Sequence, residues 1–148
     1  EKFIFDIGKG AVDNLGALET SFNKLNKVFI SHLHMDHMGD LDALYIGGWV
    51  SYRVVPLEVY GPSGKQKKYG TAYAMDRMKE MYSWDIDGRR GAQAKIGSII
   101  NTHELAFYLL YLRNACGTDR WSVPHAIELN DVIEQLLVHN NDIDSTAC

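Results

Sequence analysis

Short apolar runs and longer segments with helical spacing alternate along the first part of the chain. Three runs rich in aromatic or β-branched residues predict strands, at residues 3–7, 28–30 and 57–60. Apolar positions three and four residues apart follow each run and predict helices, at residues 12–25, 40–52 and about 65–82. The first strand is expected to be mostly buried. This alternation predicts a parallel βαβ layer and hence an α/β fold.

The pattern changes after the charged, turn-rich residues 85–91. The sequence there predicts two helices, one from Thr102 to about Asn114 and one that starts at Pro124. We therefore divide the chain into an α/β half-domain, residues 1–91, and a mainly helical C-terminal segment of unclear origin, residues 92–148. Because Glu1 is not an initiator methionine and a strand begins almost at once, we expect the chain to be a piece of a larger domain.

Composition narrows the class of protein only slightly. The 148 residues are 46% hydrophobic and 23% charged, as in ordinary globular proteins, and the net charge of −4 argues against a broad nucleic-acid-binding surface. A basic cluster of Lys65, Lys67 and Lys68 could meet a phosphate, but we interpret it as the solvated start of a helix. Cys116 and Cys148 have no disulfide-framework spacing, and no signal peptide or membrane-length apolar run is visible. We expect a cytoplasmic protein that does not enter a membrane.

The strongest chemical signal is the segment His32-Leu33-His34-Met35-Asp36-His37, which we call the histidine motif. Alternate side chains of an extended segment point to the same side, so His32 and His34 can share one metal ion. Asp36 and His37 fall in the turn beyond and face a neighbouring position. Imidazole nitrogens with one carboxylate favour Zn²⁺, with Mn²⁺ or Fe²⁺ as alternatives. The sequence therefore predicts one or two metal ions just beyond the end of a strand.

Three stretches together resemble the metallo-β-lactamase superfamily. They are FIFDIGKG, VFISHLHMDHMGDL and LEVYGPSG, and they cover roughly residues 2–88. The GDL after the motif and the LEVYGPSG stretch are most similar to the ribonuclease Z and arylsulfatase-like branch. The resemblance implies one βαβ half of an αββα sandwich, followed here by the mainly helical segment.

The resemblance also implies a chemistry. Members of the superfamily hold two zinc ions and a bridging hydroxide that hydrolyses an ester such as a phosphodiester, a sulfate ester or a lactone. By position, His32 and His34 would hold the first metal, and Asp36 and His37 the second. Asp36 could also accept a proton as the hydroxide attacks, which makes it the candidate catalytic residue. Asp6 would be a buried carboxylate at a strand end that orients the motif.

The second half of the superfamily's ligand set has no clear counterpart here. His125 is a weak candidate, whereas His103 and His139 are interpreted as surface residues of helices. Three hypotheses follow: a metal-dependent hydrolase of a phosphodiester or other small ester, a catalytically inert metal-binding partial domain, or an interaction module. In the last, a second copy or another chain would complete the fold against an open sheet face.

Overall fold

The structure is a computed structural model that describes residues 2–105 of the chain. Within these residues, strands alternate with helices. The strands are β1 (Ile4–Phe5), β2 (Lys27–Phe29), β3 (Leu57–Pro62) and β4 (Ile100–Leu105). The α-helices are α1 (Ala11–Ala17), α2 (Met35–Met38), α3 (Leu41–Val50), α4 (Thr71–Met81) and α5 (Ser83–Arg89). Three 3₁₀ turns complete the order: η1 (Phe22–Lys24), η2 (Lys67–Tyr69) and η3 (Lys95–Ser98).

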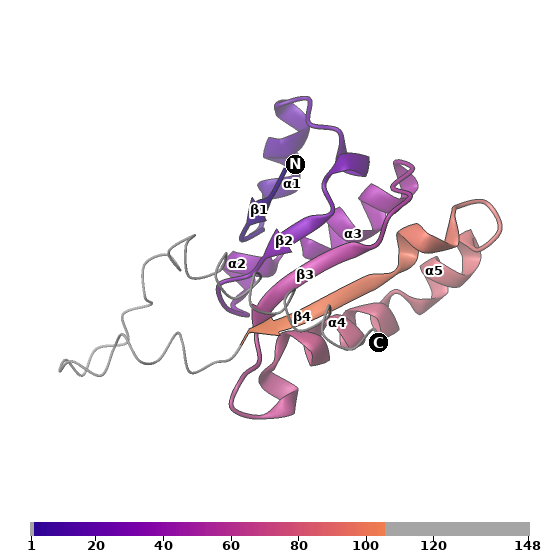
Figure 1. The fold of residues 1–148 in the computed structure, drawn as a ribbon. Coiled ribbons are helices and arrows are strands. Elements are labelled where there is room, and N and C mark those ends of the chain that lie inside the picture. Colours follow the sequence, from indigo (N-terminus) through magenta and orange to yellow (C-terminus); the bar gives the residue numbers. More distant parts are fainter. Residues whose placement is uncertain (1, 106–148) are drawn as a thin grey trace, which may run out of the picture. The chain divides into compact units, whose positions relative to one another are not determined.

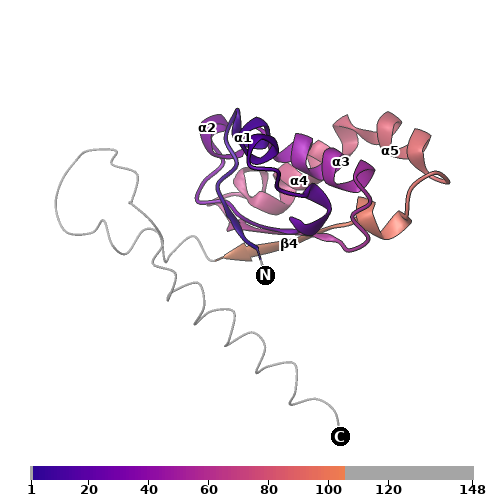
Figure 2. The ribbon, with the colours of Figure 1, turned by 90° about the horizontal axis from the view of Figure 1, so that it is seen from above.

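The four described strands form one parallel sheet in the order β1-β2-β3-β4 (Figure 1). Parallel crossovers are right-handed in nearly all proteins, and successive crossovers that step in the same direction place their helices on the same face of the sheet. Figure 2 shows the labelled helices on one side of the sheet. The predicted α/β fold is confirmed, and the opposite face carries no helix from residues 2–105.

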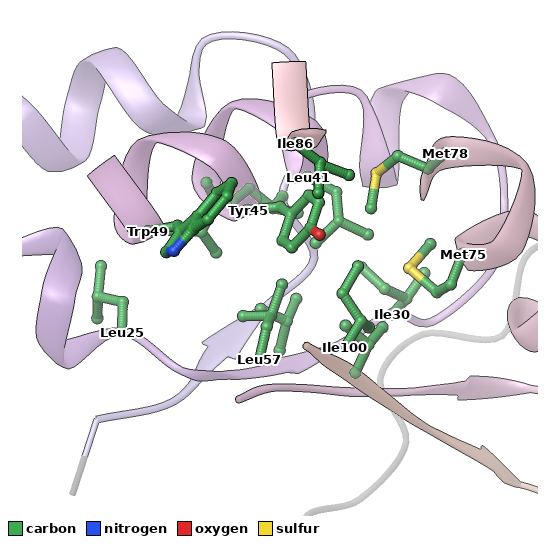
Figure 3. Packing of buried hydrophobic residues seen from close by; sticks show 14 residues of the cluster. Leu25, Ile30, Leu41, Tyr45, Trp49, Leu57, Met75, Met78, Ile86 and Ile100 are labelled. Carbon is green, nitrogen blue, oxygen red and sulfur yellow. The ribbon is translucent and has the colours of Figure 1, made fainter. Parts of the chain in front are cut away.

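The core lies between the sheet and these helices. Tyr45 and Trp49 of α3 are 0% and 1% exposed and belong to one buried cluster with Met75 and Met78 of α4, which lie on the Tyr45 side of it (Figure 3). The polar groups of these two side chains of α3 also form hydrogen bonds. The Tyr45 hydroxyl donates to the carbonyl of Ser98 at 2.7 Å, and the Trp49 indole N–H donates to the carbonyl of Ala94 at 2.8 Å. These bonds attach α3 to the segment that leads into β4.

The open face of the sheet carries a row of stacked rings, which we call the aromatic ladder: Phe5, Phe29, Tyr60 and His103. The register places one of these residues on each strand, and neighbouring ring centroids lie 5.1, 4.6 and 4.4 Å apart. Phe5 is 57% exposed. The expectation that residues 3–7 form a mostly buried strand is therefore wrong for the phenylalanine side chains, because they face away from the helices. Of the alternating residues Phe3, Phe5 and Ile7, only Ile7 is buried.

Two predicted helices are shorter than expected. The helix predicted for residues 12–25 ends at Ala17, because Glu19 adopts a left-handed backbone conformation with φ of 51°. The helix predicted to begin near residue 65 begins at Thr71. The three lysines before it belong to a loop and a 3₁₀ turn, so their interpretation as the start of a helix is wrong.

The structure also corrects the region after residue 82. Residues 85–91, predicted as a turn-rich junction, contain most of α5, in which Arg89 bonds Asp85 and Ile86 packs on the core. The predicted helix from Thr102 is wrong for residues 102–105, which form most of β4 and pair with β3. The sheet thus extends into the predicted C-terminal segment. The division at residue 91 stays a prediction, and the helix predicted from Pro124 lies outside the described residues.

Candidate metal centre

The histidine motif begins immediately after β2, at the carboxyl edge of the sheet. Ile30 N–H still donates to Tyr60 O of β3 at 2.7 Å, and the chain then leaves the sheet at Ser31. His32 to His34 form an irregular stretch, and a single helical turn, α2, follows. The amides of His37 and Met38 both donate to His34 O, at 3.0 and 3.2 Å, which closes that turn. Ligand sites of parallel α/β sheets lie at this edge.

Asp6 holds the motif from the neighbouring strand end. Its carboxylate accepts bonds from Ser31 N–H at 2.7 Å, the Ser31 hydroxyl at 2.8 Å and His37 Nδ1 at 2.7 Å. Burial alone would raise the pKa of Asp6, but the bonds from the Ser31 backbone, His37 and the Ser31 hydroxyl together hold that pKa below its ordinary value. The expected orienting role of Asp6 is supported by these contacts. Its side chain is 30% exposed, so the expected burial is only partial.

These bonds determine where the ring protons lie. A carboxylate only accepts, so the bond to Asp6 requires that His37 Nδ1 carry the hydrogen. The single hydroxyl hydrogen of Ser31 is donated to Asp6, so the 3.0 Å contact between Ser31 Oγ and His32 Nδ1 also requires a ring N–H donor. In the neutral form of each ring, Nε2 therefore keeps its lone pair. A carboxylate or hydroxyl that fixes the far nitrogen in this way is typical of metal-ligating histidines.

The structure brings the four predicted ligands together as two pairs. His32 Nε2 lies 3.0 Å from His34 Nδ1, and His37 Nε2 lies 3.6 Å from a carboxylate oxygen of Asp36. The His32 and His37 rings are 3.9 Å apart between centroids. Burial lowers the pKa of His32, and the neighbouring His37 and His34 lower it further, which favours the neutral, metal-binding form of that ring.

The donor set fits a metal ion in chemistry but is incomplete in number. Among residues 2–105, no three His, Cys, Asp or Glu side chains are gathered closely enough to hold an ion by themselves. His103 lies elsewhere, on the open face in β4, where its Nε2 is 2.7 Å from Glu58 Oε2. His125 and His139 lie outside the described residues. The assignment of His32, His34, Asp36 and His37 as ligands stays a prediction.

Backbone contacts fix the motif from the loop between β1 and α1. Ile7 N–H donates to His37 O at 2.7 Å, and Asp40 N–H donates to Ile7 O at 3.0 Å. The Asp40 carboxylate in turn accepts the Val12 N–H of α1 at 3.1 Å. Gly8 lies so close to the carbonyl of Asp36 that a Cβ atom would overlap it. The roles of Ser31 and Gly8 were not predicted from the sequence, although Gly8 follows the first predicted strand and Ser31 precedes the histidine motif.

Replacing Gly8 with alanine is expected to lower the free energy of unfolding by about 1–3 kcal/mol, because the new methyl group overlaps backbone that cannot rotate away. Gly16→Ala is the matched control. That glycine lies in α1 with open space around it, so alanine should raise stability by about 0.5–1 kcal/mol. Urea denaturation of both variants checks the pair. A Gly8→Ala protein as stable as the Gly16→Ala protein would contradict the close packing of the loop.

The apolar side chains of the motif line a separate hollow of about 400 Å³. Leu33 comes from the extended stretch, and Met35 and Met38 share one face of α2 because they are three residues apart. Residues of α3 and α4 complete the hollow: Asp42, Arg77, Met78 and Met81. The three histidines of the motif are not among the residues that line this hollow.

Comparisons with known proteins support the fold class of the described residues. The family model described as anti-Pycsar protein Apyc1 matches residues 1–63. Ribonuclease Z of Mycolicibacterium gilvum is 32% identical over 92 residues, which are 60% of this chain and 30% of the relative. Ribonuclease BN of Escherichia coli O7:K1 is 44% identical over 72 residues, which are 47% of this chain and 23% of the relative.

A solved structure of human tRNase Z, short form (ELAC1), shares the fold with a TM-score of 0.50 at 24% identity. The match covers 70% of this chain and 33% of the human chain. These matches support the metallo-β-lactamase superfamily for the N-terminal part of the chain, and the described residues fit a partial metallo-β-lactamase fold. Within that superfamily, its similar proteins bear the names ribonuclease Z, ribonuclease BN and tRNase Z. The chain spans less than a third of the length of the two curated relatives.

No described helix is both long enough and apolar enough to cross a membrane.

Proposed function

We propose that this chain supplies the first half of the metal centre of a hydrolase that cleaves phosphodiester bonds. The observation that carries the proposal is the network of Asp6, Ser31 and His37, which in the neutral ring leaves His37 Nε2 unprotonated, 3.6 Å from the exposed carboxylate of Asp36. Such a network prepares ligands for a cation. The names of the similar proteins, ribonuclease Z and ribonuclease BN, support a phosphodiester as the substrate class.

Each motif residue has a role in this proposal. His32 and His34 would hold one ion and Asp36 with His37 a second, with Zn²⁺ as the preferred metal and Mn²⁺ or Fe²⁺ as alternatives. A bound zinc ion lowers the pKa of its water to about 7 and so supplies hydroxide at neutral pH. Asp36, whose side chain is 76% exposed, would accept the proton released in the attack. Asp6 keeps His37 in the required tautomer.

A second candidate function is a metal-binding partial domain without catalytic activity. It is favoured by the absence of a closed three-ligand group among residues 2–105. For hydrolysis, the remaining ligands must come from outside these residues, either from elsewhere in the same protein or from a second copy or another chain. The two candidates share metal binding and differ in turnover.

The test has two measurements on the full chain. After dialysis against zinc, elemental analysis should find at least one Zn²⁺ per chain, and His34→Ala should remove most of it. His103→Ala is the matched control, because that histidine is exposed on the open face and away from the motif. Equal zinc in the wild-type and His34→Ala proteins would disprove the metal site.

Hydrolysis then separates the two candidates. With Zn²⁺ or Mn²⁺ supplied, we expect bis-p-nitrophenyl phosphate to be cleaved and Asp36→Ala to abolish the activity. An aryl sulfate tests the arylsulfatase-like alternative. A protein that binds zinc but cleaves neither compound is the inert partial domain.

A further inference from the structure

The hollow of about 400 Å³ has no part in the proposed metal centre. Its volume lies within the range of about 300–1,000 Å³ that is typical of sites for small molecules. Such sites are mostly apolar and contain a few polar groups that orient the ligand. This hollow has the same character, because leucine and methionine side chains dominate its lining and only Asp42 and Arg77 carry a charge.

The methionines of the chain gather around this hollow. All five occur in α2 and α4 at a spacing of three residues, at positions 35, 38, 75, 78 and 81. Four of them line the hollow, and the fifth, Met75, is buried in the core. A methionine side chain is unbranched and polarizable, so it adapts its shape to whatever apolar group it meets. The lining can therefore close around a flexible apolar ligand.

Burial differs across the lining of the hollow. Leu33 and Met38 are partly buried and pack against the hydrophobic core, and Met78 is only 8% exposed. Met35 and Met81, by contrast, are 73% and 68% exposed. A ligand that covers these two side chains removes apolar surface from water, which favours binding.

Asp42, the carboxylate of the hollow, already has hydrogen-bond donors. One of its carboxylate oxygens accepts the Ala43 N–H at 2.7 Å, and the other accepts the Tyr82 hydroxyl. The bond to Asp42 raises the pKa of Tyr82 to about 12, so this hydroxyl remains a donor at neutral pH. A cationic ligand would compete with these two donors for Asp42.

Arg77, the cation of the hollow, can bind a further partner. Its side chain is 51% exposed, and its Nη2 atom lies 2.6 Å from Glu80 Oε1. Its guanidinium also lies 5.0 Å from the centre of the Tyr73 ring, a cation–π contact within α4. A guanidinium has five N–H donors, so Arg77 can bind a second carboxylate without releasing Glu80. The hollow thus complements an apolar molecule that ends in an anionic group.

We propose that this hollow binds a small amphipathic carboxylate, with its hydrocarbon part among the methionines and its carboxylate at Arg77. The inference is independent of the proposed function, because none of the three histidines of the motif lines the hollow. Each CH₂ group that becomes buried raises the affinity by up to about fourfold, which is equivalent to about 0.8 kcal/mol. A fatty acid of medium length, such as octanoate, is therefore preferred over a shorter acid.

Nuclear magnetic resonance of the full chain with ¹³C-methyl methionine tests the site directly. The titration is done in EDTA, so that no metal ion at the histidine motif holds the carboxylate. Octanoate should shift the methyl signals of the four methionines that line the hollow and leave the Met75 signal in place. It should bind at least about tenfold more tightly than butanoate. A Met75 signal that moves as far as the others, or equal affinities for the two acids, would overturn the proposal.

Substitutions at the exposed Met81 test the apolar contact. Met81→Glu places a charge in the hollow and should weaken octanoate binding by at least about tenfold. Met81→Leu keeps the hollow apolar and should bind octanoate within about twofold of the wild type. Val54→Glu adds the same charge at a position that is 61% exposed and does not line the hollow, so it should leave the affinity unchanged. Wild-type affinity in Met81→Glu would overturn the site.

Substitution of Arg77 tests the contact with the head group. Arg77→Gln should weaken octanoate binding about two- to fivefold and leave the binding of 1-octanol unchanged, because the alcohol carries no charge. Lys79→Gln is the matched control, since Lys79 lies on the same helix, pairs with Asp76 at 2.9 Å and does not line the hollow. Equal losses in the two variants, or an equal loss for the alcohol, would disprove the assignment of the carboxylate to Arg77.

Two other occupants of the hollow would give different results. A second copy of the chain would exclude octanoate and form a dimer that Met81→Glu dissociates, which size-exclusion chromatography detects. A lipid surface would make the chain sediment with vesicles of phosphatidylcholine and phosphatidylglycerol while free octanoate does not bind. Either result would overturn the proposal. Failure to bind zinc or to cleave bis-p-nitrophenyl phosphate would remove the proposed function and leave octanoate binding unaffected.

Discussion

Asp6→Asn should weaken zinc binding by about 10–100-fold while leaving the fold intact. The asparagine oxygen can still accept the Ser31 N–H, but its amide nitrogen, which only donates, would face His37 Nδ1. His37 must then accept at Nδ1 and carry its proton on Nε2, the nitrogen that the metal requires. Competition with a chromophoric chelator measures the affinity, and nitrogen chemical shifts of the ring report the tautomer.

Comparison with Asp6→Ala separates the effect of Asp6 on the His37 tautomer from its effect on the backbone conformation. Asp6 adopts a φ of 54°, a left-handed conformation that aspartate and asparagine tolerate and that costs alanine about 1–2 kcal/mol. This variant should therefore lose both stability and zinc affinity, whereas Asp6→Asn loses affinity alone. Asp13→Asn, an exposed acid in the first turn of α1, serves as the charge control. Wild-type zinc affinity in Asp6→Asn would show that Asp6 does not set the tautomer.

Arg53→Ala is expected to lower the free energy of unfolding by about 3 kcal/mol or more. Arg53 is 0% exposed, and its guanidinium donates to the carbonyls of Tyr45 at 2.9 Å and Gly97 at 3.0 Å. A longer bond of 3.3 Å reaches Leu44 O. Truncation removes these bonds between α3 and the segment before β4 and leaves a cavity the size of the side chain.

Burial of the Arg53 charge, by contrast, lowers the stability of the protein and offsets part of what its hydrogen bonds contribute. The guanidinium of Arg53 bonds backbone carbonyls within residues 2–105, and burial lowers its pKa to about 10, so the side chain is still charged at neutral pH at a cost in desolvation. Arg53→Met fills much of the cavity without a charge and should lose only about 1 kcal/mol. Urea denaturation compares the two. Arg90→Ala, at an exposed ion pair, should change stability by less than about 0.5 kcal/mol. If methionine is as damaging as alanine, the hydrogen bonds outweigh the packing.

The elements that sequence predicted well are those whose apolar pattern agrees with their tertiary environment. β3 alternates buried and partly buried residues, and α3 buries a stripe against the sheet, so both were visible in the sequence. β4 was missed because its exposed face is polar. Glu58 of β3 bonds both Asn101 and His103 of β4, and these cross-strand contacts have no local signature.

The candidate site was predictable in its position and only partly in its geometry. The spacing of His32, His34 and His37 after a strand places the motif at the sheet edge, where the structure has it. The hydrogen-bond partners that fix the ring protons of His32 and His37 could not be predicted from local sequence. Ser31 acts through a hydroxyl that bonds a carboxylate 25 residues away, a distance that no local pattern reports.

The hydrogen bonds described for the histidine motif come from one short stretch of the chain. Asp6, Ile7, Ser31 and Asp40 supply them, whereas residues beyond position 40 line the apolar hollow beside the motif. A recombination breakpoint in the gene downstream of β3 would therefore leave these hydrogen bonds in place, whatever sequence is joined there. The histidine motif and its hydrogen bonds are in this sense a transferable unit.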